Sequence, residues 1–379
     1  MDPYLRDVLD ACLRLLHVVA GIAWIGASFY FIRLDLGLRP TPGRSDDSVG
    51  EYWGVHGGGF YHSRRYALPP DPVPEPLHWF KWEAYTTWLS GFSLLVVLYY
   101  TDARARLVDP GIADLEPWQA VTLSVGGLAL GWLVYDVLCR VVRDERALAV
   151  CVAALVVGTA FAAGQLFAAR AAYLQVGAML GTIMAANVFR VIIPAHWELV
   201  RAREARRPPD PAPGLEAKRR SVHNNYLTLP VVFAMLAGHF PVAYGHSRAW
   251  LVLLAVMALL AFVRHFFNLW HRGRRAWWIL GVAAAAVVAL ALVLRPEDEA
   301  TGAAVPTDVE VGAIVQLRCA RCHSGVAAPK GIRLGSAADV RARAELVATM
   351  VRSRAMPPGN ATGMTDAERR ALLAWLGSG

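Results

Sequence analysis

The sequence predicts an all-α protein: an eight-span transmembrane helix bundle followed by a small all-α domain. Composition is the first indication, because 56% of the 379 residues are hydrophobic and only 18% are charged, whereas soluble domains are about half apolar and about a quarter charged. The second is a series of apolar runs, each long enough to cross a bilayer as a helix. The third is an abrupt change to polar composition after Leu294. Together they exclude an all-soluble globule, a disordered chain and a fibrous repeat.

Eight apolar runs make up the expected membrane domain, residues 1–295. Asp136 and Arg264 are the only acidic or basic residues within these runs. Pro230 and Pro241 fall inside one run and are expected to kink or end its helix. The eight expected spans are residues 15–32, 84–101, 118–139, 147–169, 171–189, 221–247, 249–271 and 276–294.

The distribution of basic residues orients these spans. Residues 33–83, 140–146, 190–220 and 264–275 hold 21 Lys and Arg residues, and the segments on the opposite side hold seven. Basic loops stay in the cytoplasm, so both chain termini are expected outside it. Cytoplasmic loops thereby explain most of the net charge of +8. The expected surroundings are a lipid bilayer, and no nucleic-acid partner is expected.

The chain beyond the last span divides into a linker, residues 296–307, and a soluble domain, residues 308–379. A domain this small buries too little apolar surface to be stable without a covalent or cofactor-based constraint. Thr365 and Glu368 have the spacing of a capping box, which predicts the start of a helix. The helices expected in the domain cover residues 309–321, residues 337–353 and a last segment that Gly377 ends.

The run Cys319-Ala-Arg-Cys322-His323 supplies such a constraint. C-x-x-C-H places two thiols one helical turn apart, where both can add to the vinyl groups of a haem, and the adjacent histidine then lies beneath the ring as an iron ligand. A zinc site would need two more Cys or His residues, which the tail lacks, and a thioredoxin-like redox pair would need a βαβ context. Covalent haem c is the expected cofactor.

A methionine is expected as the second axial ligand of the iron. Met356 begins the run Met-Pro-Pro-Gly-Asn, an extended segment between two helices that can present a side chain to the far face of the haem. Met364 and Met350 are the competing candidates, although Met350 reads as a core residue of the preceding helix. His323 and Met356 are therefore the expected iron ligands.

Histidines in the expected spans are further candidates, because polar residues at membrane depth are costly and usually functional. With the orientation given above, His17 and His239 lie near the outer ends of their spans, and His223 and His265 lie near the inner ends. Either pair could hold a haem b between helices. The alternative is that each histidine hydrogen-bonds a neighbouring helix.

The first cytoplasmic loop carries the richest group of polar and aromatic residues. His56 precedes the triple glycine 57–59, which allows close approach of the backbone to a ligand or helix. His78, Lys81 and Glu83 combine an acid–base pair with a cation among three tryptophans, and such surroundings suit a flat aromatic anion. The alternative is an interfacial aromatic belt with a snorkelling lysine. These four residues, His56 included, are the candidate catalytic set.

Four segments carry a resemblance to a known family. They read LHVVAGIAWIGASFYFIRLD (16–35), EYWGVHGGGFYH (51–62), LHWFKWEAYTTWLSGF (77–92) and HNNYLTLPVVFAM (223–235). They resemble the membrane-bound urate oxidase family of bacteria, also called urate hydroxylase, whose members have an eight-span domain followed by a cytochrome c tail. The resemblance covers essentially the whole chain, and the HWFKWEAYTTWLSG run is specific.

The resemblance implies oxidation of urate to 5-hydroxyisourate in the bacterial inner membrane, with the N-terminus and the cytochrome c domain on the periplasmic side. It implies that electrons pass to the respiratory chain, through a terminal oxidase or a soluble cytochrome c, and that oxygen is not reduced to peroxide. Two other classes stay open: a quinol-to-cytochrome c electron-transfer protein without an organic substrate, and a transporter or sensor with a regulatory haem. The aromatic, cation-bearing loop favours the enzyme.

A cytoplasmic substrate site and an outer haem c would be separated by the hydrocarbon core, which is about 30 Å thick. One electron hop through protein does not cover that distance efficiently. A haem b relay on histidines such as His17, His239, His223 and His265 is therefore expected. The alternative is an outward-facing urate pocket near His17 and Trp24.

Overall fold

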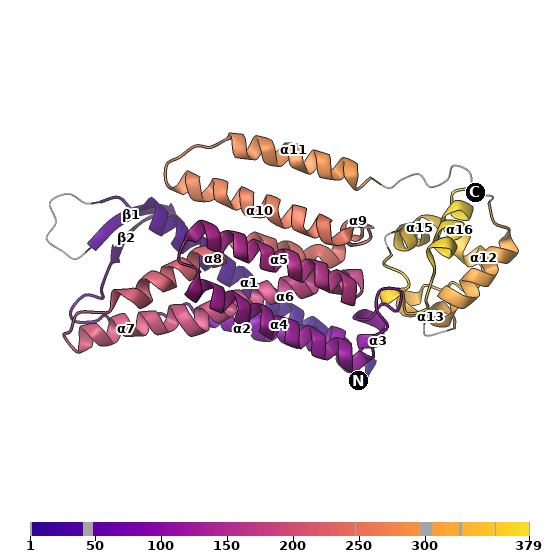
Figure 1. The fold of residues 1–379 in the computed structure, drawn as a ribbon, viewed down its shortest axis with the longest axis horizontal. Coiled ribbons are helices and arrows are strands. Elements are labelled where there is room, and N and C mark those ends of the chain that lie inside the picture. The colour runs from indigo at the N-terminus through magenta and orange to yellow at the C-terminus, as the bar shows by residue number, and fades with distance from the viewer. Residues whose placement is uncertain are drawn as a thin grey trace.

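A computed structural model describes residues 2–40, 48–246, 248–295, 305–325, 328–352 and 354–378 of the chain. Helices account for most of this part of the chain, in agreement with the predicted class. Figure 1 shows a long helical bundle with a two-stranded hairpin at one end and a group of short helices, the tail, at the other. The tail comprises the described residues from 305 onward.

The bundle is formed by long helices, two of which run directly into a π-helical turn. Its elements are α1 (Pro3–Gly37), α2 (Trp82–Leu95), η1 (Val96–Tyr100), α3 (Ala103–Arg106), α4 (Pro117–Val141), α5 (Glu145–Leu166), α6 (Ala169–Asn187), η2 (Val188–Ile192), α7 (Ile193–Glu204), α8 (Pro211–Leu236), η3 (Ala237–His239), α9 (Pro241–Tyr244), α10 (Ala249–His271) and α11 (Trp278–Val293).

Several helices have the length and composition of membrane spans. In the described chain, five helices are long and apolar enough: Tyr4–Gly37, Pro117–Val141, Glu145–Leu166, Ala169–Glu204 and Ala249–His271. A sixth apolar helix, α11, is shorter. The other two expected spans become α2 with η1, and α8; α2 has only 14 residues, and α8 begins with a charged segment. The helices are thus compatible with a membrane protein.

The two prolines of one expected span act differently. Pro230 lies inside α8, which continues past it to Leu236. The chain then breaks, and Pro241 occupies the first turn of α9, where the missing N–H of proline costs no hydrogen bond. The expected single span over residues 221–247 is therefore a long helix followed by two short turns.

The hairpin departs from the all-α expectation. Strands β1 (Ser48–His56) and β2 (Gly59–Tyr66) are antiparallel, and His56 pairs with Gly59 at the tip. Gly57 and Gly58 have φ angles of +56° and +81°, as a two-residue type I′ turn requires. A Cβ atom at either glycine would meet nothing within 4 Å. Gly57 and Gly58 therefore form the hairpin turn, Gly59 begins β2, and no helix among the described residues lies against the two turn glycines.

Helix α6 occupies the middle of the bundle, packed by α4, α5 and α8. Two glycines permit this packing because they let helix backbones approach closely. A Cβ atom at Gly177 of α6 would lie 2.7 Å from Cβ of Ala234 on α8, and one at Gly131 of α4 would lie 2.5 Å from Cγ of Met179 on α6. The small side chains thus position the polar groups of α4, α6 and α8 against one another.

The tail folds around its own apolar core. The capping box predicted at Thr365 is confirmed, since Thr365 N donates to Glu368 Oε2 over 2.7 Å and Glu368 N donates back to Thr365 Oγ1 over 3.2 Å. The helix expected over residues 337–353 is two helices. The elements of the tail are α12 (Asp308–Val315), η4 (Gln316–Ala320), α13 (Arg321–His323), η5 (Pro329–Gly331), α14 (Ala337–Arg341), α15 (Ala344–Arg352), η6 (Pro358–Asn360) and α16 (Asp366–Leu376).

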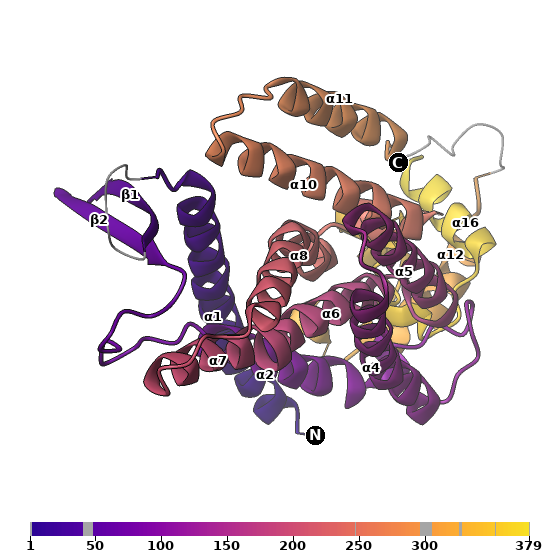
Figure 2. The same ribbon diagram turned by 60° about the vertical axis from the view of Figure 1, so that its left-hand side comes forward.

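The tail docks on the bundle end that also carries the N-terminus. Turn η6 lies against α3, and Ala355 packs on the core of the bundle. The first turns of α1 reach the same end, where Arg6 Nη1 lies 3.3 Å from Asp102 Oδ2. The hairpin lies at the opposite end, as both views show (Figures 1 and 2). The N-terminus and the tail therefore share one end of the bundle, and the hairpin lies at the other.

Candidate functional site

The C-x-x-C-H motif spans two consecutive helical turns of the tail. Cys319 lies in η4, and Cys322 and His323 lie in α13. Both thiols are free, with Cys319 half-buried and Cys322 exposed, and burial raises the pKa of the Cys319 thiol. His323 Nδ1 donates a hydrogen bond to the Ile332 carbonyl over 2.8 Å. Such a bond orients an imidazole and leaves Nε2 free for a metal, so these residues fit a covalently attached haem.

The candidate methionines differ in burial. Met364 is 3% exposed within the tail core, whereas Met356 is 36% exposed in the segment before η6. Buried Arg369 holds that segment by donating to the Met356 carbonyl over 2.8 Å and to the Val351 carbonyl over 3.2 Å. Met356 is thus the more exposed of these two residues, and hydrogen bonds from Arg369 hold the backbone of its segment.

No three His, Cys, Asp or Glu side chains within the described ranges gather into a site for a directly bound metal ion. A haem iron needs only axial ligands from the protein. The tail offers such ligands in His323 and Met356.

The structure brings three of the four candidate catalytic residues together where α2 begins. We call His78, Lys81 and Glu83 the α2 cluster. His78 Nε2 lies 3.8 Å from Glu83 Oε1, and Lys81 Nζ lies 5.8 Å from the ring centroid of Trp82. Glu83 Oε2 is buried, and no described residue forms a hydrogen bond with it. The cluster can exchange a proton with a ligand and offers it a cation.

An aromatic cavity of about 270 Å³ adjoins this cluster. His78, Trp79 and His196 line it, and Trp79 stacks on Trp197 with ring centroids 4.3 Å apart. His56 does not line the cavity; it lies at the exposed hairpin tip, where its backbone pairs with Gly59. The structure thus separates His56 from the other three residues of the set.

The outer pair of membrane histidines differs in environment. His17 Nδ1 donates to the Thr87 carbonyl of α2 over 2.9 Å, and its Nε2 lies 3.5 Å from Met235 Sδ of α8. A Cβ atom at Gly91 would lie 2.8 Å from the His17 ring, so this glycine makes room for the imidazole. His239 is exposed in η3. His17 therefore joins three helices, as expected of a histidine that bonds neighbouring helices.

The inner pair also bonds to tyrosines on other helices. His223 Nδ1 lies 2.8 Å from the hydroxyl of Tyr135 on α4, and His265 Nδ1 lies 2.7 Å from the hydroxyl of Tyr226 on α8. Nδ1 is thus engaged in both imidazoles, and Nε2 of His223 lies 3.8 Å from Glu145 Oε2.

A buried polar network between α4, α6 and α8 was not predicted. Arg220 is 2% exposed; it donates to Asp136 Oδ1 over 3.0 Å, to Glu216 Oε1 over 2.6 Å and to Asn187 Oδ1 over 3.1 Å. Asn187 in turn donates to Asn224 Oδ1 over 2.9 Å. Each of the three guanidinium nitrogens donates a hydrogen bond, two of them to carboxylates, so the charge is compensated.

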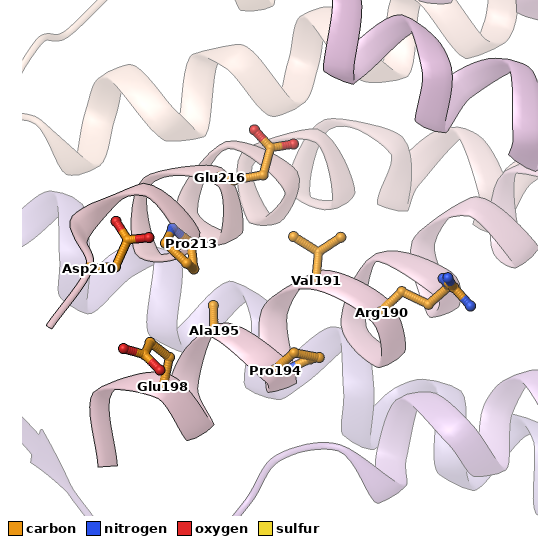
Figure 3. Close-up of a pocket in the computed structure, with 8 residues that line it drawn as sticks. All are labelled: Arg190, Val191, Pro194, Ala195, Glu198, Asp210, Pro213 and Glu216. Carbon is orange, nitrogen blue, oxygen red and sulfur yellow. The ribbon is translucent and has the colours of Figure 1, made fainter. Parts of the chain in front are cut away.

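The network borders the cavity drawn in Figure 3, which measures about 420 Å³. Glu216 reaches its wall from α8, opposite Glu198 of α7, and Asp210 lies where α8 begins. Arg190 is the one basic residue among its eight lining residues. Three carboxylates against one guanidinium do not suit an anionic ligand.

A second buried arginine lies between α1, α8 and α10. Arg264 is 3% exposed and donates through Nε to Asn225 Oδ1 over 2.5 Å. Its guanidinium carbon lies 3.7 Å from the ring centroid of Phe29. Its Nη2 is buried and has no hydrogen-bond partner among the residues that the structure describes. Asn225 also donates to Asn268 Oδ1 over 3.0 Å.

Two signals in the sequence could have found these clusters. Asp136 and Arg264 are the only charges within the expected spans, and the adjacent Asn224 and Asn225 interrupt an apolar run. Intramembrane polar residues mark functional sites by default. Their partners could not be read from the sequence, because they come from different helices.

The helical fold has several described helices of membrane length and buried polar clusters between its helices, and it is compatible with a membrane protein. Residues 3–295 match the family model described as urate oxidase N-terminal. The chain therefore belongs to this urate oxidase family, which indicates an oxidoreductase with a urate-related function. No curated protein and no solved structure matches the chain.

Proposed function

We propose that the protein oxidises urate within the bundle and passes the electrons to a haem c attached to the tail. The observation that carries the proposal is the match of residues 3–295, nearly the whole bundle, to the urate oxidase family. The tail adds a C-x-x-C-H motif whose histidine is oriented by the Ile332 carbonyl.

The proposed reaction needs an acceptor for electrons and one for a proton. The urate monoanion and one water give neutral 5-hydroxyisourate, one proton and two electrons. A bound haem c would supply an acceptor that takes the two electrons one at a time, in two successive transfers. In the tail, Cys319 and Cys322 would attach it, and His323 and Met356 would bind its iron. Oxygen then need not react with the substrate, and no peroxide forms.

The α2 cluster is our proposal for acid–base exchange at the hairpin end of the bundle. His78 and Glu83 lie close enough to share a proton through a ligand or a water, and Lys81 attracts an anion. The unpartnered Glu83 Oε2 supports this role, since a ligand N–H would satisfy it. His56 is the weakest member of the proposed set because the hairpin tip separates it from the other three.

The proposed surroundings are a bacterial inner membrane with the N-terminus and the tail on the periplasmic side. Five apolar helices of membrane length support the proposed location in a membrane. The tail and the N-terminus share the bundle end opposite the hairpin, as the distribution of basic residues requires. A periplasmic tail would pass electrons to a terminal oxidase or a soluble cytochrome c.

A haem b relay inside the bundle stays a proposal. His17, His223 and His265 each bond another helix through Nδ1, an arrangement that also orients metal-binding imidazoles. A pyridine haemochrome spectrum of purified protein separates haem b from haem c and counts both. One haem per chain, all of type c, in fully active protein would eliminate the relay.

The experiment that tests the proposed function compares membranes carrying wild-type protein with those carrying Cys322→Ala. We expect wild-type membranes to consume urate without releasing hydrogen peroxide. Urate consumption should stop when the terminal oxidase is inhibited. Cys322→Ala should lack covalent haem and this activity, whereas the matched control Cys12→Ala should keep both. Stoichiometric peroxide, or turnover with a quinol but not with urate, would overturn the proposal.

A further inference from the structure

We infer that Arg264, Asn225 and Asn268 form a buried binding site for a planar anion between α1, α8 and α10. The existence of the site stands on the geometry alone. Its assignment to urate rests on the proposed function, according to which urate is the planar anion that the bundle binds and oxidises.

The first support is an uncompensated charge. Arg264 is 3% exposed and, among the described residues, forms no ion pair with any carboxylate. Burial of an isolated cation costs several kcal/mol even after relaxation. Asn225 offsets only part of this cost because it is a neutral acceptor. A bound anion would supply the missing countercharge.

The second support is an unused donor that points to the form of the ligand. Arg264 Nη2 is buried without a partner while Nε is bonded to Asn225. The Phe29 ring covers one face of the guanidinium, with 3.7 Å between the guanidinium carbon and the ring centroid. An acceptor must therefore approach in the guanidinium plane, where arginine binds planar anions through parallel N–H bonds.

The two asparagines add matching polarity. Asn225 and Asn268 are 2% and 5% exposed, and their amides are joined by a hydrogen bond of 3.0 Å. Primary amides can donate and accept, so the pair can adapt to a ligand that carries both N–H and carbonyl groups. Urate carries both along its edges. The same three helices thus offer a cation, amides and an aromatic ring.

The buried site and the partly exposed α2 cluster differ in the strength with which they hold an anion. Water screens the charge of a lysine near the surface, whereas the interaction of Arg264 with an anion is much stronger in a buried position. We therefore assign firm binding of the substrate anion to Arg264, and proton exchange near the hairpin end to the α2 cluster.

The test uses full-length purified protein and two probes, urate under anaerobic conditions and nitrate, a planar anion that is not the proposed substrate. An anion that binds the folded state raises the unfolding temperature, and the rise grows with the logarithm of 1 + [anion]/Kd. We expect both probes to stabilise the wild type and neither to stabilise Arg264→Gln. Arg264→Lys keeps the charge without the planar fork, so it should retain weaker binding.

Asn225→Asp gives a second, independent variant. It places a carboxylate against Arg264, supplies the countercharge within the protein and should abolish stabilisation by both anions. Its own unfolding temperature should not fall, so lost binding could not be ascribed to misfolding. Arg104→Gln, which removes an exposed charge near the tail end, is the matched control and should bind both anions normally.

Steady-state turnover separates failure of the site from failure of the proposed function. We expect Arg264→Gln to raise KM for urate about ten- to a hundredfold, the worth of a charge-assisted contact. If KM for urate and stabilisation by anions are both unchanged in this variant, the inference is overturned, and a water molecule is the partner of Nη2. The proposal of urate oxidation would not be affected by that result. Anion binding lost in Arg264→Gln without urate turnover in the wild type would support the site and overturn the proposed function.

Discussion

Arg220 and Arg264 are both buried guanidinium groups, on the neighbouring helices α8 and α10, yet their surroundings differ. Arg220 contacts the carboxylates of Asp136 and Glu216. Arg264 contacts a neutral amide and a phenyl ring, and its Nη2 has no partner. The fold therefore neutralises the charge of Arg220, whereas the charge of Arg264 could be neutralised by a bound anion.

The tail repeats this contrast on a smaller scale. Arg318 forms an ion pair with Glu368, with 2.9 Å between Nη2 and Oε1. Arg369 is 6% exposed, and among the described residues its partners are backbone carbonyls and the Asn360 side chain. Burial lowers the pKa of Arg369. Arg220 and Arg318, which pair with carboxylates, thus connect helices. Arg264 lies in the proposed anion site, and Arg369 holds the segment of the proposed iron ligand Met356.

The largest effect is expected for Arg220→Leu. Removal of the guanidinium would leave Asp136 buried with only the exposed Arg140 as an ion-pair partner. Loss of one partner of a buried pair costs about 3–5 kcal/mol. Thermal unfolding of the purified protein in detergent should therefore show a large drop for this variant. A drop no larger than that of Arg264→Gln would contradict the distinction between the two arginines.

A smaller effect of opposite sign is expected for Asn225→Asp. A carboxylate beside Arg264 replaces a neutral acceptor by a charged one, and hydrogen bonds to charged groups contribute about 1.5–3 kcal/mol. The unfolding temperature should rise. The same measurement on Arg264→Gln should change little, because that variant removes an uncompensated charge and keeps an amide donor. A lower unfolding temperature for Asn225→Asp would mean that Arg264 already has a countercharge.

The fold could be predicted where one segment carries its own signal. The apolar runs predicted α1, α4, α5, α6 and α10, and the Thr365 capping box marked the start of α16. The alternation of EYWGVHGGGFYH around a glycine pair is typical of a hairpin, but the surrounding membrane-type composition led to an all-helical expectation. Local signals of this kind needed no knowledge of the tertiary structure.

The candidate sites were predictable to different degrees for the same reason. C-x-x-C-H is contiguous, and so is the α2 cluster of His78, Lys81 and Glu83. The environment of Arg264 depends on Phe29 and Asn225, which lie far away in the sequence. The sequence pattern shows that Arg264 is a charge within an apolar run, but only the helix packing shows that it lacks a countercharge.

The third prediction moves the contrast to the tail. Arg369→Gln would lose bonds to the carbonyls of Val351 and Met356, at a cost of about 1 kcal/mol for each hydrogen bond. If Met356 is the iron ligand, the freed segment should weaken the iron–sulfur charge-transfer band. Arg318→Gln is the control: it should lower stability and leave that band unchanged. Loss of the band in Met364→Ala, with the band intact in Met356→Ala, would show that the other methionine is the ligand.

The smallest effect concerns pH. Burial acts to raise the pKa of Glu368, but hydrogen bonds from Thr365 and Arg318 outweigh it, so the pKa lies below its ordinary value. A lowered pKa in the folded state stabilises the fold above the unfolded pKa of about 4.3, and that contribution disappears as the pH falls through the folded pKa. Unfolding of the tail should therefore become easier below about pH 4.3, and less so in Glu368→Gln. An identical acid dependence in wild type and variant would contradict this.

The central claim is that electrons from urate reach a haem in the tail. The most direct measurement adds urate anaerobically to oxidised, full-length protein and follows the visible absorbance of its haem. We expect reduction of a c-type haem in the wild type, slower reduction at low urate concentration in Arg264→Gln, and no c-type signal in Cys322→Ala. A haem c that stays oxidised while the same sample consumes urate in air with stoichiometric peroxide would contradict the claim.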